Sequence, residues 1–98
     1  MKAMEIKRFA YAFDANDFVE GAVWEVPEPV PPAGHSYKYR LVYIVDGSRI
    51  IGFDNERGKG DHRHDGATEI AYEFRGIDQL LEDFASAVEA WRLANGKA

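Results

Sequence analysis

The residue types best suited to chemistry gather in the middle of this chain, between residues 35 and 64. Cleavage of a phosphodiester without a metal needs an acid, a base and cations beside the phosphate oxygens. Histidine titrates in the range that suits the first two roles, and Lys or Arg suits the third. Glycines at 58 and 60 allow the backbone to wrap closely around an anion. The candidate catalytic residues are His62, His64, Asp61, Lys59 and Glu56.

A second set of polar residues precedes or adjoins these and is suited to holding a substrate. Its cations would surround the phosphate, and Tyr39 could stack on unpaired bases. Asp54 and Glu56 could form a carboxylate pair or could neutralise Lys38 and Arg57. The candidate substrate-binding residues are His35, Lys38, Tyr39, Arg40, Asp54, Asn55 and Arg57.

A metal is the main alternative for the histidines. In an extended segment His62 and His64 would share a face, and His35 or Asp61 could complete a metal site. A His-x-His pair is more often two surface histidines. Neither a metal nor another cofactor is therefore predicted, and the reaction considered is a metal-independent one.

Aromatic residues offer both a functional and a structural interpretation. Tyr37, Tyr39 and Tyr43 alternate and could stack on unpaired bases. A tyrosine-rich face covered by the proline-rich residues 27–34 is the commoner outcome, and Trp24 is assigned to the core together with Trp91.

Charge and composition narrow the possible partners. The formal net charge is −5, but residues 35–65 hold six Lys and Arg against five Asp and Glu, which would focus an anionic substrate there. Because there is no cysteine, disulfides and thiolate chemistry are excluded. Charged residues at the start and the lack of a long apolar run predict neither a signal peptide nor a membrane span, so a cytoplasmic location is expected.

The elements that must position these residues fit a single domain over residues 1–98. Residues 5–13 and 18–26 are aromatic-rich or alternating and predict a first hairpin. All four prolines lie within residues 27–34, which predicts a stiff crossover around the sheet.

A second hairpin is predicted from residues 36–45 and 48–56. The Asp46-Gly47 pair between them suits a type I′ turn, in which both central residues have positive φ. A regular two-residue loop places Tyr39 opposite Asp54 and Arg40 opposite Phe53.

The remaining chain predicts a polar loop over residues 57–66, a strand over 68–74 and a helix. Apolar residues recur at helical spacing from Ile77 to Trp91, and Asn95-Gly96 offers a stop. The predicted fold is α+β, with a five-stranded, mainly antiparallel sheet (two hairpins plus a fifth strand) and one C-terminal helix packed on one face.

The polar segment itself resembles a known family. HSYKYRLVY at residues 35–43, Asp46-Gly47, and GFDNERGKGDHRH at residues 52–64 are similar to the signature of the TumE family of bacterial toxin–antitoxin toxins. The resemblance covers roughly residues 24–91, with Phe53 where tyrosine is expected. It implies a growth-inhibiting protein encoded beside a helix-turn-helix antitoxin, but it supplies no catalytic residues.

The function expected from residues and resemblance together is a toxin that cleaves RNA. Many small α+β toxins do so, which is an argument by analogy. The alternative is a non-catalytic protein whose polar loop docks nucleic acid or a protein partner. An exposed edge strand would permit a homodimer.

Overall fold

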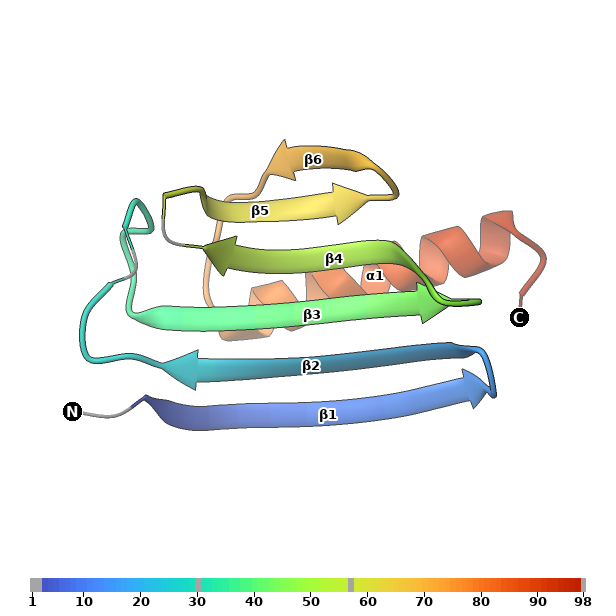
Figure 1. Ribbon diagram of the computed structural model, residues 1–98, viewed down its shortest axis with the longest axis horizontal. Helices are drawn as coiled ribbons and strands as arrows, with labels where there is room; N and C mark the ends of the chain where they lie inside the picture. The colour runs from blue at the N-terminus through green and yellow to red at the C-terminus, as the bar shows by residue number, and fades with distance from the viewer. Residues whose placement is uncertain (1–2, 30, 57, 98) are drawn as a thin grey trace.

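The computed structural model describes residues 3–29, 31–56 and 58–97, and in these residues one antiparallel sheet is followed by one helix. Each strand pairs with the next one along the chain, so the spatial order is β1-β2-β3-β4-β5-β6 (Figure 1). The elements are β1 (Met4–Asp14), β2 (Asp17–Glu25), β3 (Tyr37–Val45), β4 (Ser48–Glu56), β5 (Gly60–Asp65), β6 (Thr68–Ala71) and α1 (Ile77–Ala94).

The predicted α+β class, antiparallel sheet and C-terminal helix are confirmed, but the sheet has six strands instead of five. The additional strand is β5, which lies where a polar loop was expected. The predicted crossover at residues 27–34 is also wrong, because β2 and β3 pair directly and this segment simply joins them. The last predicted strand is shorter than expected and ends at Ala71.

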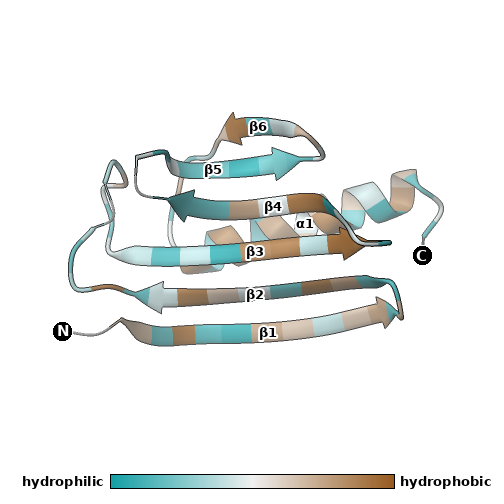
Figure 2. Cartoon of the chain, in the orientation of Figure 1, coloured by the Kyte–Doolittle hydropathy of each residue, from teal (hydrophilic) through white to brown (hydrophobic). Residues whose placement is uncertain are grey.

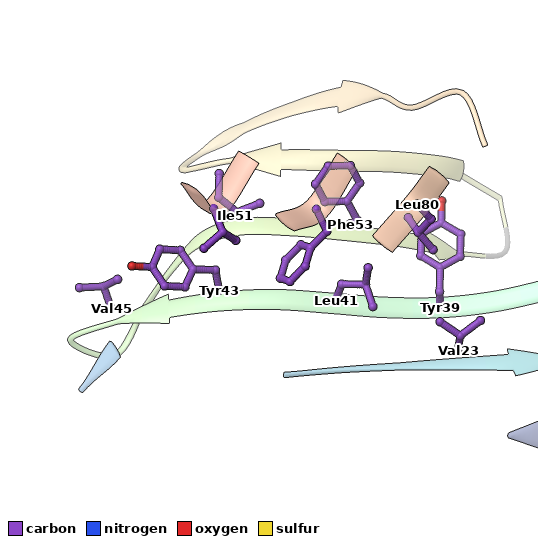
Figure 3. Packing of buried hydrophobic residues seen from close by; sticks show 10 residues of the cluster. Val23, Tyr39, Leu41, Tyr43, Val45, Ile51, Phe53 and Leu80 are labelled. Carbon is purple, nitrogen blue, oxygen red and sulfur yellow. The ribbon is translucent and has the colours of Figure 1, made fainter. Parts of the chain in front are cut away.

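The helix covers one face of the sheet, which we call the helix face. In Figure 1 it runs behind the middle strands, so the viewer looks at the opposite, open face. Side chains from β3 and β4 project toward the helix and pack against Leu80 (Figure 3). The buried core consists of Val23, Tyr39, Leu41, Tyr43, Val45, Ile51, Phe53, Leu80, Phe84 and Val88.

The hairpin of β3 and β4 contains a bulge that the sequence did not predict. The turn has the expected positive φ at Asp46 (50°) and Gly47 (81°). Ile44 pairs with Arg49 but Tyr43 pairs with Ile51, so Ile50 is an extra residue in β4. Beyond the bulge every pairing shifts by one residue.

This shift decides which β4 side chains face the helix. Leu41 lies opposite Phe53, and Arg40 lies opposite Asp54. The predicted pairs of Tyr39 with Asp54 and of Arg40 with Phe53 are therefore wrong. Because side chains alternate along a strand, Phe53 enters the core and Asp54 lies on the open face.

The aromatic residues follow the same division of faces. Tyr39 and Tyr43 are 1% and 0% exposed on the helix face, beneath the helix and the segment after β6, so they cannot stack on bases. Trp24 was assigned to the core, but it is half-buried and lies on the open face opposite Lys38.

The end of the helix is tied to the sheet by a buried carboxylate. Asp17, which is 1% exposed, accepts a hydrogen bond of 2.6 Å from the Arg92 guanidinium. Lys97 Nζ lies 3.2 Å from the same oxygen. A groove of about 600 Å³ remains between α1 and the first strands, with Phe9, Phe84 and Val88 in its lining.

Candidate functional site

The strand β5 positions most of the candidate site, although its sequence contains no aliphatic residue and no Phe, Tyr or Trp. It is hydrophilic along its length in Figure 2. Its residues alternate between buried and half-buried side chains, which shows that both faces of this strand are packed. Because successive side chains point to opposite faces, β5 divides the sequence-predicted residues into two groups.

The first group lies on the helix face and centres on Asp61. One oxygen of Asp61 accepts a hydrogen bond of 2.7 Å from the Tyr39 hydroxyl and lies 2.8 Å from His35 Nε2. The His35 ring stacks on Phe74 with 3.9 Å between ring centroids. Burial, and then the Asp61 hydrogen bond, raises the pKa of Tyr39, so its hydroxyl keeps its proton.

Both nitrogens of His35 are engaged within this group. His35 Nδ1 accepts a hydrogen bond from the Tyr37 backbone N–H, and Nε2 therefore carries the proton that is donated to Asp61. A ring held in this way has no free nitrogen for proton transfer. The contacts of His35, Tyr39 and Asp61 are those of a structural network.

Asn55 also belongs to the helix face and is 1% exposed. Its side chain accepts a hydrogen bond from the Tyr39 N–H and donates one to the Tyr37 carbonyl. These bonds join the ends of β3 and β4 where backbone pairing stops. Asn55 therefore joins the two strands.

The second group lies on the open face and consists of Asp54, His62 and His64, which we call the Asp54 cluster. His62 Nε2 is 2.6 Å from Asp54 Oδ1, and His64 Nε2 is 3.6 Å from the same oxygen. One ligand atom from each residue lies within 4.8 Å of the others. His62 and His64 are 3% and 8% exposed, so the interpretation of a surface pair is wrong.

Backbone features explain why these three side chains meet. His62 pairs with Asp54 in the ladder between β4 and β5, and His64 pairs with Gly52. Gly52 has no side chain, so the His64 ring and the Arg49 side chain occupy the space above it, 3.5 and 3.0 Å from the position of a Cβ. The bulge at Ile50 turns Asp54 toward this face.

The sequence did not identify Glu69 as a member of this site. Glu69 pairs with His64 across β5 and β6, and its Oε2 lies 4.0 Å from His64 Nδ1. The same oxygen lies 3.8 Å from Lys59 Nζ. The sequence did contain a signal for Glu69, since consecutive strand residues place Glu69 and Ile70 on opposite faces. Placing Glu69 beside His64 also required residues 60–65 to be recognised as a strand.

The other sequence-predicted residues surround the Asp54 cluster or lie apart from it. Arg40 is exposed and sits opposite Asp54 in the ladder. Lys38 is exposed on the same face, and Glu56 is exposed at the end of β4. Arg57 lies outside the described residues.

A shallow depression adjoins the cluster on the open face. It has a volume of about 350 Å³, and Arg8, Glu20, Trp24 and Arg40 contribute to its lining. The Arg8 guanidinium lies 5.8 Å from the centre of the Trp24 ring. An aromatic ring flanked by arginines, with a single glutamate beside them, can hold a base and its phosphate.

Comparison with known proteins identifies the family. The model of the family described as Toxin TumE matches residues 3–92, which include every residue of both groups. The chain belongs to the TumE toxin family. No curated protein and no solved structure matches it.

Membership of the TumE toxin family supports a role as a toxin and implies an antitoxin partner. The resemblance expected from residues 24–91 is therefore confirmed, and the match extends into the N-terminal hairpin. No helix in the described part of this TumE-family chain combines the length and the hydrophobicity that a membrane crossing requires.

Proposed function

We propose that this TumE-family toxin stops growth in the cytoplasm by cleaving RNA at the Asp54 cluster. The observation that carries the proposal is the convergence of two buried histidines and a carboxylate on the face of the sheet that no described helix covers. Buried polar groups are costly unless they are paired or used. His64 supports a chemical role, because its two nitrogens lie 3.6 and 4.0 Å from the nearest carboxylate oxygens, beyond ordinary hydrogen-bond distance.

The surroundings of the cluster favour a nucleic acid as substrate. Arg40 lines the depression at Trp24 and lies opposite Asp54, so it connects the depression to the Asp54 cluster on one face of the sheet. Strands are about 4.8 Å apart, so the path from β2 to β5 spans about 14 Å, which suits two or three nucleotides. Bases would stack at Trp24 while Arg8, Lys38 and Arg40 contact phosphates.

The partly exposed aromatic ring of Trp24 favours single-stranded RNA, whose bases can stack on it. The described residues also place no helix on the open face that could enter a groove of a nucleic-acid duplex. Sequence-tolerant binding of single strands combines exposed aromatic rings with cations along a surface. The partner that would restrain the toxin is an antitoxin of helix-turn-helix type, as the family resemblance implies. A homodimer through the edge strand β1 is a further proposal that the cluster does not require.

The experiment compares two carboxylates on opposite faces of the same sheet. Growth is followed after induction of the wild type, Asp54→Asn, His64→Gln and, as matched control, Asp61→Asn. Purified chains are then incubated with an excess of single-stranded RNA. Asp54→Asn and His64→Gln are expected to abolish growth arrest and cleavage, whereas Asp61→Asn keeps both at a temperature where it remains folded.

Two outcomes would count against this assignment. Cleavage retained in both Asp54→Asn and His64→Gln would move the reaction away from the cluster. RNA that is bound in a salt-dependent way without product beyond one equivalent would favour the alternative function, in which the toxin sequesters RNA or a protein partner.

A further inference from the structure

We propose that Asp54, His62 and His64 bind one divalent transition-metal ion, with Zn²⁺ as the representative of its class. The ligands would be a carboxylate oxygen and the Nε2 atoms of both imidazole rings. Where the reaction is concerned, this inference rests on the proposed function. Metal binding itself is independent of what the toxin cleaves.

The first argument is the position of the proton on His62. His62 Nδ1 lies 3.0 Å from the Gly60 carbonyl oxygen, which can only accept a hydrogen bond, so Nδ1 carries the proton. In the neutral ring the Nε2 lone pair then faces Asp54 Oδ1 across 2.6 Å. Neither of these buried atoms has a hydrogen bond within the described residues. Two facing lone pairs require a positive species to hold them together. A proton fits the 2.6 Å gap, and a metal ion would bind both atoms once they separate to about 3.3 Å.

The second argument is that both histidines have the surroundings of metal ligands. A ligating histidine usually donates its other ring N–H to a carbonyl or a carboxylate, which fixes the ring orientation. His62 Nδ1 lies 3.0 Å from the Gly60 carbonyl oxygen, and the Glu69 carboxylate, 4.0 Å from His64 Nδ1, would complete the same arrangement on moving closer. In each ring the remaining nitrogen, Nε2, points toward Asp54.

The third argument is distance. Zn²⁺ binds nitrogen and oxygen ligands at about 2.0–2.1 Å in a tetrahedral arrangement, which places the ligand atoms about 3.3 Å apart. The separations from Asp54 Oδ1 to the two Nε2 atoms are 2.6 and 3.6 Å, one on each side of that value. Because the ligand atoms of the three residues lie within 4.8 Å of one another, rotations of the Asp54, His62 and His64 side chains that draw the two rings together would produce the required geometry.

The donor set also selects the kind of metal. Two imidazoles suit zinc, iron, nickel and copper, whereas Mg²⁺ and Ca²⁺ prefer oxygen ligands. Three protein ligands leave a further position for water or for a phosphate oxygen. The side chains of Asp54 and His64 are 16% and 11% exposed, against 4% for His62, so such a group would approach past Asp54 and His64. A bound metal would make the RNA cleavage metal-dependent, in contrast to the expectation from sequence.

The test is zinc binding by a tag-free full chain that has been treated with a chelator and dialysed. Calorimetric titration with ZnCl₂ measures stoichiometry and affinity, and the visible absorption of added Co²⁺ reports coordination by nitrogen and oxygen. We expect one ion per chain. The double variant Asp54→Asn/His64→Gln is expected to lose this site, whereas His35→Gln, which removes the histidine on the other face, is expected to keep it.

Glu69→Gln gives a second, milder variant at a partly exposed position. Its side chain would orient His64 less firmly, and we expect zinc affinity to fall by about 10–100-fold while circular dichroism stays unchanged. The inference is overturned if the wild type binds no zinc, or if the double variant binds it with the same affinity and stoichiometry. Those results would assign a proton to the position between His62 and Asp54.

Failure of the metal site and failure of the proposed function are distinguishable. Zinc binding without RNA cleavage would retain the metal site and reject the reaction. Cleavage that persists in a chain that binds no zinc would retain the reaction and reject the metal.

Discussion

Asp61 and His62 are neighbours in the chain, yet their side chains lie on opposite faces of the sheet. Asp61 bonds Tyr39 and His35 beneath the helix, whereas His62 faces Asp54 on the open side. A cluster of chemically capable residues in the sequence is therefore two clusters in space. One has the contacts of a structural network, and the other brings two histidines and a carboxylate together.

Removing the Asp61 carboxylate should lower stability without removing activity. Asp61→Ala leaves the buried Tyr39 hydroxyl and the His35 ring without their acceptor. We expect the free energy of unfolding, measured by urea titration, to fall by about 1–3 kcal/mol. Growth arrest should persist at reduced temperature. Loss of growth arrest with an unchanged urea midpoint would place Asp61 in the site instead.

Acid should weaken the fold through Asp17 and Asp83. Burial alone would raise the pKa of Asp17, but hydrogen bonds from Tyr43, Lys97 and Arg92 outweigh it, and the native pKa is lowered. The Tyr72 hydroxyl is the main cause of the lowered pKa of Asp83.

The sign of the pH dependence follows from these directions. A carboxyl group with a lowered native pKa stabilises the fold fully above its unfolded pKa, 3.8 for Asp17, and loses this contribution as pH falls through the native pKa. Stability from denaturant titrations should therefore drop below pH 3.8. The free energy of unfolding of Asp17→Asn should be about 2 kcal/mol below that of the wild type at neutral pH, and it should fall less than that of the wild type as the pH is lowered. If the stability of Asp17→Asn fell with acid as steeply as that of the wild type, this account would be contradicted.

Gly21 and Gly52 should respond differently to alanine. A Cβ at Gly21 would lie 2.5 Å from Leu41 Cδ2 and 2.6 Å from Phe9 Cζ, so packed apolar side chains must move. We expect Gly21→Ala to destabilise the fold by about 1–3 kcal/mol. A Cβ at Gly52 meets the flexible end of Arg49 at 3.0 Å, and Gly52→Ala should cost less than about 1 kcal/mol. Equal unfolding midpoints for the two variants would refute the packing argument.

Arg40 should contribute to RNA affinity through its charge. Arg40→Gln removes an exposed cation beside Asp54, and the slope of log affinity against log salt should decrease by about 0.7 for a single-stranded RNA. Lys7→Gln is the matched control, because it removes the same charge from the groove on the helix face. Fluorescence anisotropy with a short RNA at several salt concentrations measures the affinity and the salt slope of each variant. Equal losses in the two variants would indicate a general charge effect.

Much of the fold could be predicted from patterns with a direct physical cause. The turn at Asp46-Gly47 follows from its positive φ angles, and the helix follows from the spacing of Leu80, Phe84 and Val88. The strand β5 could not be predicted in the same way. Its two faces meet a polar site and a polar network, so hydrophobic alternation, the usual signal of a strand, is missing.

The composition of the site was predicted better than its arrangement. His62, His64 and Asp54 were all candidates, but Asp54 was expected to contact substrate and Asp61 to act with the histidines. The wrong strand pairing came from the register, because a bulge leaves no mark in a sequence of β-branched residues such as Ile50 and Ile51. Without the bulge, Asp54 would face Tyr39.

The bulge also has a consequence for how this protein can change over time. Loss of the single codon for Ile50 would exchange the faces of all later β4 residues, sending Asp54 inward and Phe53 outward in one event. A replacement of one amino acid by another changes one side chain and does not exchange the faces of the whole strand. At this position of β4 a deletion or insertion is therefore more disruptive than a substitution. Sequence alignments of relatives must count the residues before and after Ile50 separately.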